Sequence, residues 1–225
     1  MKPLHRSWCK AARKAAVVCI LIAPFIGKVH GEEPVLPLDA AIAADQNGKA
    51  TQASAETNTA ADIPIWRRIT LGTYKGPNAV RNAFDALGLR IGNSADEILG
   101  RPAFPFSRAK TTVDLVKVTM RDLGFAEKRT TVTEIYKRAA QLGLELCPAE
   151  VGPLLRLEYR DQPVGEFLQI AMQPVATYGG DLVSLTVANG GAGLLLLGGD
   201  GRGDIEFNSG TKFIFVRPAR IANIP

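Results

Sequence analysis

Residues 182–197, LVSLTVANGGAGLLLL, combine two strand-like segments with a glycine-rich turn. From Val183 to Val187 every second residue is apolar, which is the period of a strand with one buried face. Residues 194–197 form a wholly apolar run, and residues 189–193 supply the turn. This stretch therefore predicts two antiparallel strands in the second half of the chain.

Strand-like patterns continue on both sides of this stretch. Apolar and polar residues alternate over 155–160 and 168–173, and an apolar run occupies 212–216. Turns that contain glycine separate these segments. The second half therefore predicts an antiparallel meander of four or five strands.

The first half of the chain has the spacing of helices. Apolar residues three and four apart follow Gly76, and Gly88 provides a left-handed stop. A second helix is predicted over 132–142, because Thr131 and Glu134 have the spacing of a capping box at its start.

Two further elements are predicted between these helices. Ser94 and Glu97 repeat the capping-box spacing before a shorter helix at 95–100. Residues 113–120 are apolar and rich in β-branched side chains, which favours a buried strand. We therefore predict a single domain of the α+β class, with the helices packed on the apolar face of the meander.

The N-terminus has the features of a secretory signal peptide. Five Lys and Arg residues precede an apolar run from Ala15 to Gly27, and no acid occurs before Glu32. The run is shorter than the roughly 20 residues that a membrane-spanning helix needs. Residues 1–31 are therefore predicted to be a signal peptide, with an uncleaved anchor as the alternative. Either way we expect an exported protein, periplasmic or secreted, that meets the membrane only through this segment.

Removal of the signal peptide changes the chemistry that remains. Residues 1–31 hold six of the 27 Lys and Arg residues and no acid, which leaves 21 basic against 22 acidic residues. Nucleic-acid binding is not expected from this balance. Both histidines and two of the three cysteines are also removed. Catalytic triads with histidine and zinc sites with imidazole are thereby excluded, and we predict no metal or other cofactor.

The remaining chain divides by composition. Residues 32–61 are rich in Ala, Thr, Asn, Gln and Asp, and we predict a disordered linker there. Residues 62–218 have the length of one globular domain, and residues 219–225 are assigned as a tail.

Three stretches resemble a domain that recurs in uncharacterised bacterial proteins. They are LGTYKGPNAVRNAFDALGLRIGNSADEILGRPAF, TVDLVKVTMRDLGF and IYKRAAQLGLELCPAEVGPLLRLEYRDQPVGEFLQIAMQPV, and the resemblance covers roughly residues 68–217. It implies one folded domain and carries no activity, ligand or catalytic residue with it.

The candidate binding residues flank one predicted turn. Asp161 and Glu166 stand on either side of residues 162–165, and with Arg156 and Arg160 they are expected to form a polar cluster at one end of the sheet. Ion pairs on the surface of a hairpin are the alternative explanation.

Two other features each allow both a chemical and a structural interpretation. Cys147 precedes a possible helix start, which could activate its thiol, but its apolar neighbours favour a buried structural cysteine. Asp200, Asp204 and Glu206 could offer oxygen ligands to a cation, but their spacing matches no standard calcium loop and favours a solvated turn.

Two functions from different classes remain open. The first is a non-catalytic module that binds an envelope polymer, a peptide or another protein. The second is a carboxylate-dependent hydrolase that acts on an envelope polymer and uses two of Glu150, Glu158, Asp161 and Glu166. The absence of any familiar hydrolase constellation favours the first.

Overall fold

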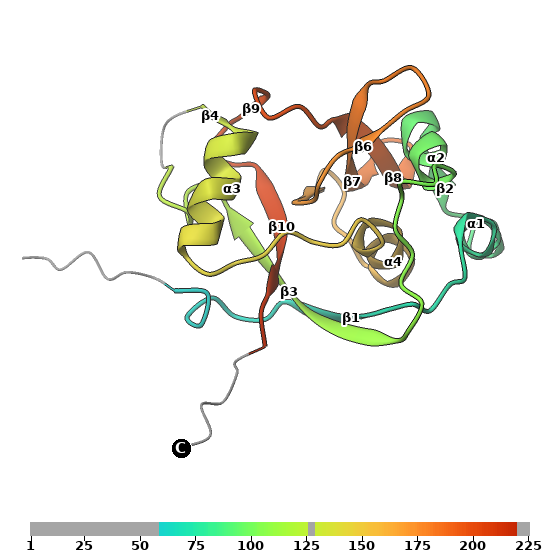
Figure 1. Ribbon diagram of the computed structural model, residues 1–225, viewed down its shortest axis with the longest axis horizontal. Coiled ribbons are helices and arrows are strands. Elements are labelled where there is room, and N and C mark those ends of the chain that lie inside the picture. The colour runs from blue at the N-terminus through green and yellow to red at the C-terminus, as the bar shows by residue number, and fades with distance from the viewer. Residues whose placement is uncertain (1–58, 126–128, 220–225) are drawn as a thin grey trace, which may run out of the picture. The chain divides into compact units, whose positions relative to one another are not determined.

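The computed structural model describes residues 59–125 and 129–219 (Figure 1). All of these residues belong to one compact unit, Ala53–Pro225. The predicted signal peptide and residues 32–58 of the predicted linker lie outside the described residues. Among the described residues no helix has both the length and the apolar character that crossing a membrane requires.

The described part of the chain contains four helices and ten strands. The helices are α1 (Pro77–Ala86), α2 (Asn93–Leu99), α3 (Val132–Gln141) and α4 (Val151–Glu158). The strands are β1 (Arg67–Leu71), β2 (Arg90–Ile91), β3 (Thr111–Thr119), β4 (Thr130–Thr131), β5 (Phe167–Ile170), β6 (Val175–Ala176), β7 (Leu182–Gly190), β8 (Gly193–Asp200), β9 (Glu206–Phe207) and β10 (Lys212–Arg217).

The strands form one large mixed sheet, so the predicted fold class was wrong. Its order is β1-β3-β10-β5-β7-β8-β2, β6 adds to β7, and β4 pairs separately with β9. The pairs β10·β5 and β2·β8 are parallel, whereas a meander has only antiparallel neighbours. Strands β7 and β8 form the predicted hairpin. Strand β10 does not continue a meander from them, since it pairs with β3 on one side and with β5 on the other. The patterns marked β3, β5, β7, β8 and β10 but missed β1 and the two-residue strands, and they contained no information on this pairing.

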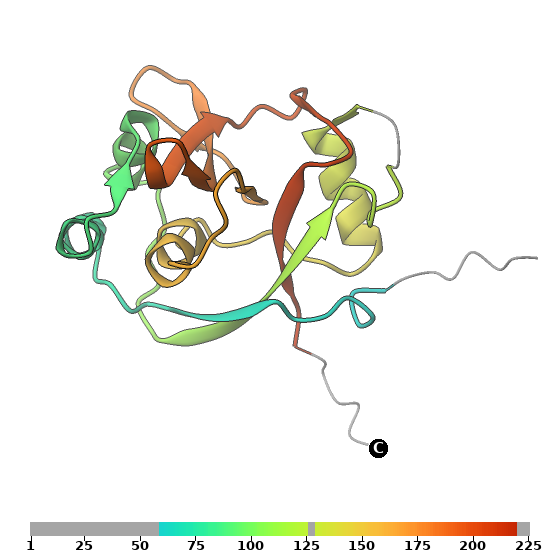
Figure 2. The same cartoon turned by 180° about the vertical axis from the view of Figure 1, so that it is seen from behind.

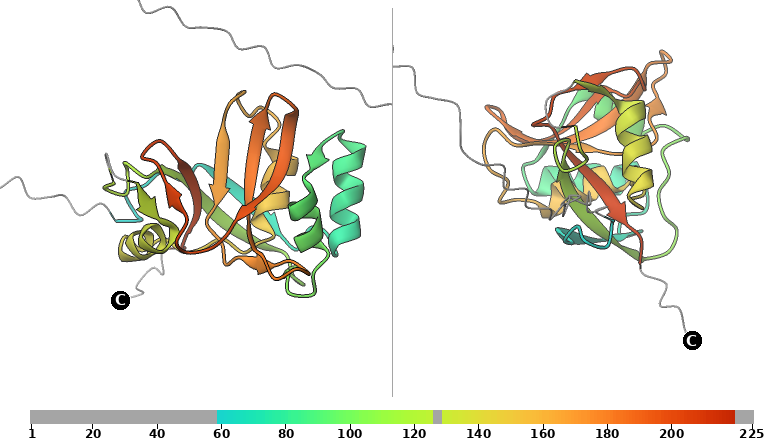
Figure 3. Two further views of the ribbon diagram at one scale, coloured as in Figure 1. Left: turned by 90° about the horizontal axis from the view of Figure 1, so that it is seen from above. Right: turned by 90° about the vertical axis from the view of Figure 1, so that its left-hand side faces the viewer.

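Helices cover both faces of the curled sheet, not one face as predicted. Figures 1 and 2 show α4 between β1 and β3 on one side and β7 and β8 on the other, in the concave face. Figure 3 shows α3 at the end of the unit opposite to α1 and α2. The buried residues accordingly form two separate apolar clusters, one with α1, α2 and α4 and one with α3.

The central strands are apolar because both their faces are buried. In β10, Ile214 belongs to the concave-face cluster, whereas Phe213 and Phe215 belong to the cluster under α3. In β3, Leu115 and Val116 divide in the same way. Strands buried on both faces lose polar alternation.

Helix α4 occupies a segment for which the sequence predicted a strand. The alternation of Leu155, Leu157 and Tyr159 with charged residues suggested a period of two, but residues 151–158 are helical. Every residue from Val151 to Leu157 is buried, Arg156 included. A helix without a polar face has no visible period of 3.6, so the pattern gave the wrong element.

The other helices were predicted at nearly their observed places. Gly88 ends α1 with a φ of 63°, and the capping box of Thr131 and Glu134 is present at the start of α3. The capping box predicted for α2 is wrong: this helix begins after Gly92 with no side-chain cap. The carboxylate of Glu97 instead accepts a hydrogen bond from the backbone N–H of Tyr178 at 2.7 Å.

Candidate functional site

Three distant segments meet at one end of the concave face. Lys117 lies on β3, Lys212 is the first residue of β10, and Glu166 immediately precedes β5. In the sheet, β10 lies between β3 and β5, with Lys212 opposite both Thr119 and Leu168. This order brings the ammonium groups of Lys117 and Lys212 to the same carboxylate oxygen, Glu166 Oε1.

Glu166 is the centre of the group. The Tyr159 hydroxyl donates to its Oε2 at 2.8 Å, while Lys212 Nζ and Lys117 Nζ lie 2.8 Å and 3.3 Å from its Oε1. We call Lys117, Tyr159, Glu166 and Lys212 the Glu166 cluster. The Glu166 side chain is only 6% exposed, whereas that of Lys212 is 40% exposed. The carboxylate is therefore internal, and one of its partners faces solvent.

The cluster keeps Glu166 ionised. Burial acts to raise the pKa of its carboxyl, but hydrogen bonds from Lys212 and Tyr159 and the positive charge of Lys117 outweigh burial, so the pKa is lowered. Burial and the nearby Glu166 carboxylate raise the pKa of Tyr159 to about 12. Glu166 is therefore a poor general acid, and Tyr159 stays protonated near neutral pH.

Aromatic side chains close the cluster on its inner side. The rings of Trp66 and Tyr159 meet edge to face with centroids 5.1 Å apart. The guanidinium of Arg67 lies over the Tyr159 ring at 4.4 Å, and Lys117 Nζ lies 4.8 Å from the Trp66 ring centre. These contacts fix the positions of cations that would otherwise be mobile side chains.

The structure separates the four residues that the sequence placed together. Glu166 enters the cluster, and Asp161 pairs with Arg67 at 3.1 Å while 80% of its side chain stays exposed. Arg160 is exposed. Arg156 is fully buried and donates to Gln162 Oε1 and to the backbone carbonyls of Tyr159 and Ala188. The two arginines therefore do not join Glu166.

Four residues of the site were not predicted from the sequence: Trp66, Lys117, Tyr159 and Lys212. Lys117 interrupts an apolar strand and Lys212 begins another, which marks them as charges next to a core. That signal was present in the sequence. The signal does not show that these residues lie together, because the sequence does not reveal that β10 pairs with both β3 and β5.

A pocket of about 280 Å³ opens beside the cluster. It lies where β5 begins and where the connection from β9 returns to β10. Phe167, which is 47% exposed, and Phe207 contribute aromatic rings to its walls. The lining residues are Gly165, Glu166, Phe167, Gln169, Phe207, Asn208, Gly210, Thr211 and Lys212.

The other carboxylates named for hydrolysis have separate roles. Glu150 is fully buried, and its two oxygens accept from the backbone N–H groups of Gly72 and Ser107, each at 2.9 Å. Desolvation raises the pKa of Glu158, with the charge of Arg67 opposing it. Glu150 thus holds two loops together and is not presented to a substrate.

The two remaining candidates are structural. Cys147 is buried, desolvation raises its pKa, and its Sγ lies 3.3 Å from the carbonyl oxygen of Ile214. Arg202 pairs with Asp200 at 2.9 Å, with Asp204 3.9 Å away. In the described part of the chain, no group of three His, Cys, Asp or Glu side chains is arranged to hold a metal ion.

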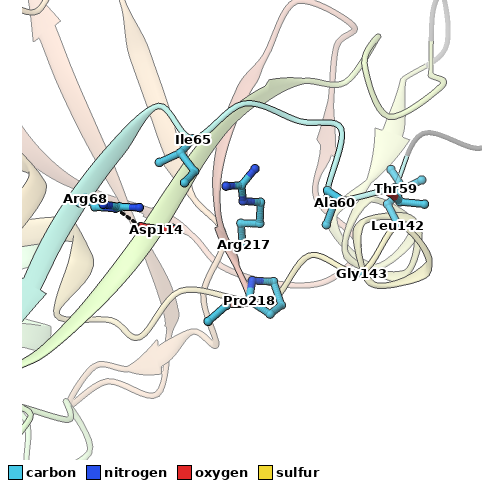
Figure 4. A pocket seen from close by; sticks show the side chains of 11 residues that line it. Thr59, Ala60, Ile65, Arg68, Asp114, Leu142, Gly143, Arg217 and Pro218 are labelled. Carbon is cyan, nitrogen blue, oxygen red and sulfur yellow. Dashed lines mark hydrogen bonds and ion pairs between the residues drawn. The ribbon is translucent and has the colours of Figure 1, made fainter. Parts of the chain in front are cut away.

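A larger cavity of about 580 Å³ lies elsewhere, where the described chain begins and ends. Figure 4 shows the Arg68–Asp114 ion pair in this cavity, with Arg217 on the neighbouring strand. Its lining includes Thr59 and Ala219, which border residues outside the described part. The pocket beside Glu166 is lined by described residues and is the candidate site.

Comparison of this chain with family models, with curated proteins and with solved structures finds no significant match.

Proposed function

We propose that the described unit is a non-catalytic binding domain of an exported protein at the cell envelope. We further propose that its ligand contacts the pocket beside the Glu166 cluster. Export rests on the basic and apolar pattern of residues 1–31. An envelope polymer or an envelope protein is the partner that this location would offer.

One observation carries the non-catalytic assignment: the titratable side chains near the pocket are bound to one another. Glu166 has three partners within 3.3 Å, and the Tyr159 hydroxyl donates a hydrogen bond to Glu166. A general acid or base must exchange a proton with substrate, which these contacts oppose. Hydrolysis with two carboxylates remains the alternative, but Glu150, Asp161 and Glu166 each have separate partners.

The proposal is tested by mixing the full chain with isolated envelope polymer. We expect the chain to sediment with the polymer, and we expect mass spectrometry of the supernatant to show no released fragment. Lys212→Met should weaken sedimentation. Lys110→Met should leave it unchanged, because Lys110 is exposed and does not line the pocket. Released fragments above those of a heat-inactivated sample, or failure to sediment, would overturn the proposal.

Export has its own test. Fractionated cells that express the full chain should contain it outside the cytoplasm, shortened by about the 31 residues of the predicted signal peptide. Unshortened chain confined to the cytosol would contradict the envelope assignment.

A further inference from the structure

We propose that the pocket beside the Glu166 cluster binds a carboxylate group on a compact organic ligand. This inference rests on the binding function proposed above and specifies the chemistry of its ligand.

The side-chain amide oxygens of Asn208 and Gln169, which line the pocket, accept hydrogen bonds from within the protein. Asn208 Oδ1 accepts from Gly210 N at 3.1 Å and from Thr211 Oγ1 at 3.2 Å. Gln169 Oε1 accepts from Thr186 Oγ1 at 2.7 Å. Within the described residues, the NH₂ groups of Asn208 and Gln169 have no partner, so both side chains retain donors.

Lys212 is a further hydrogen-bond donor among the pocket residues, and it is positively charged. One hydrogen bond joins its Nζ to Glu166, and an ammonium group has three donors. Lys212 also lines the pocket, and because 40% of its side chain is exposed, its ammonium group is open to solvent. The residues that line the pocket thus carry two neutral donor groups and one cationic donor, which favours a ligand rich in acceptors.

The charge balance favours an anion. Lys117 and Lys212 neutralise the one carboxylate of the cluster and leave one positive charge in excess. The nearby acids have other cations: Asp161 pairs with Arg67, and Glu206 pairs with Arg129 at 3.0 Å. A carboxylate in the pocket would therefore neutralise the excess positive charge, whereas a cationic ligand would be repelled by Lys212.

Size and shape limit what carries the carboxylate. About 280 Å³ is just below the usual range of ligand pockets, which begins at about 300 Å³, and suits one residue or one ring. The rings of Phe167 and Phe207 provide apolar contact for the adjacent part of the ligand. The C-terminal end of a peptide and an acidic sugar both have this chemistry, and the experiment separates them.

The test is a titration of the ¹⁵N-labelled full chain followed by NMR. N-acetyl-alanine is compared with N-acetyl-alaninamide, and glucuronate with glucose, so that each pair differs in the carboxylate. We expect at least one acid to shift the amides of 165–169 and 207–212, with its neutral partner binding about tenfold more weakly. The pair that responds identifies the source of the carboxylate. Added salt should weaken the binding of the acid.

Three variants make the result specific. Lys212→Met should remove most of the response to the acid, while Lys212→Arg, which keeps the charge, should retain it. Lys110→Met should behave as wild type, since Lys110 is an exposed lysine outside the pocket. The spectrum of each variant reports whether the fold is intact.

The inference is overturned if acids and neutral partners bind equally, if Lys212→Met binds as wild type does, or if no probe shifts these amides at millimolar concentration. Binding of neutral envelope fragments to the same amides would overturn the inference but leave the binding function standing. Release of product from envelope polymer would instead overturn the binding function.

Discussion

The guanidinium of Arg156 lies in the core, where backbone carbonyls and an amide replace the usual carboxylate partner. Its nearest acceptors belong to Gln162, Tyr159 and Ala188, and its Nε has no partner among the described residues. Burial lowers the pKa of Arg156 to about 10, and the positive charge of Arg160 acts in the same direction. The residue therefore positions the loop before Glu166 and does not face a ligand.

Replacing Arg156 by Met should destabilise the fold. The change leaves three buried acceptors without their donor, and we expect a loss of about 2–4 kcal/mol in the free energy of unfolding, measured with urea. Arg160→Met is the matched control, because Arg160 is exposed, and it should change stability by less than about 0.5 kcal/mol. Equal effects of the two variants would contradict the assigned role of Arg156.

Glu166→Gln should lower stability in a pH-dependent way. The pKa of Glu166 is lowered in the fold, so its charge stabilises the folded state above the unfolded value of about 4.3. This contribution is lost as the pH falls through the folded pKa. We expect a cost of about 1–3 kcal/mol at pH 7 and a smaller one near pH 3, from urea unfolding at both values.

Asp161→Asn is the control for Glu166→Gln. The pair of Asp161 with Arg67 is solvent-exposed, and its loss should cost about 0–1 kcal/mol. A cost for Glu166→Gln that is the same at both pH values would show that the charge of Glu166 does not stabilise the fold.

At the scale of elements, α4 packs closely against β7. A Cβ at Gly152 would lie 2.6 Å from Leu185 Cδ1, on β7. Leu185 is fully buried and has little space to move. The helix thus approaches the sheet at a point where a glycine is required.

Gly152→Ala should destabilise the fold although alanine is the better helix former. Propensity favours alanine by about 0.8–1.0 kcal/mol, but overpacking a core typically costs about 1–3 kcal/mol. We expect a lower melting temperature by calorimetry. Gly191→Ala provides a control, since no atom lies within 4 Å of a Cβ there. A more stable Gly152→Ala variant would show that α4 is not pressed against β7.

The two predicted capping boxes should behave differently. Thr131→Ala removes the observed cap of α3 and should cost about 1 kcal/mol in urea unfolding. Ser94→Ala should cost less than about 0.5 kcal/mol, because Ser94 makes no capping bond in α2. An effect of Ser94→Ala as large as that of Thr131→Ala would contradict the observed start of α2.

Local signals accounted for the helices α1, α2 and α3 and for the longer strands except β1, but not for α4. Gly88 and the Thr131 capping box marked the ends of α1 and α3, and alternation or apolar runs marked β5, β7, β8 and β10. These features depend on neighbours in the sequence. The burial of α4 on all sides depends on contacts with β1, β7 and β8, which local patterns do not contain.

At the scale of the whole unit, the pairing of distant strands creates the site. Insertion of β10 between β3 and β5 brings Lys117, Lys212 and Glu166 together. A meander of neighbouring strands would have left Lys117 in a different part of the molecule. The sequence therefore indicates that the loop with Asp161 and Glu166 is polar, but it does not indicate which residues contact Glu166.

The most direct measurement is an NMR titration of the labelled full chain with soluble fragments of envelope polymer. We expect shifts at residues 165–169 and 207–212, with no new product detected by mass spectrometry in the same sample. Shifts centred on Arg68 and Arg217, or the appearance of product, would contradict it.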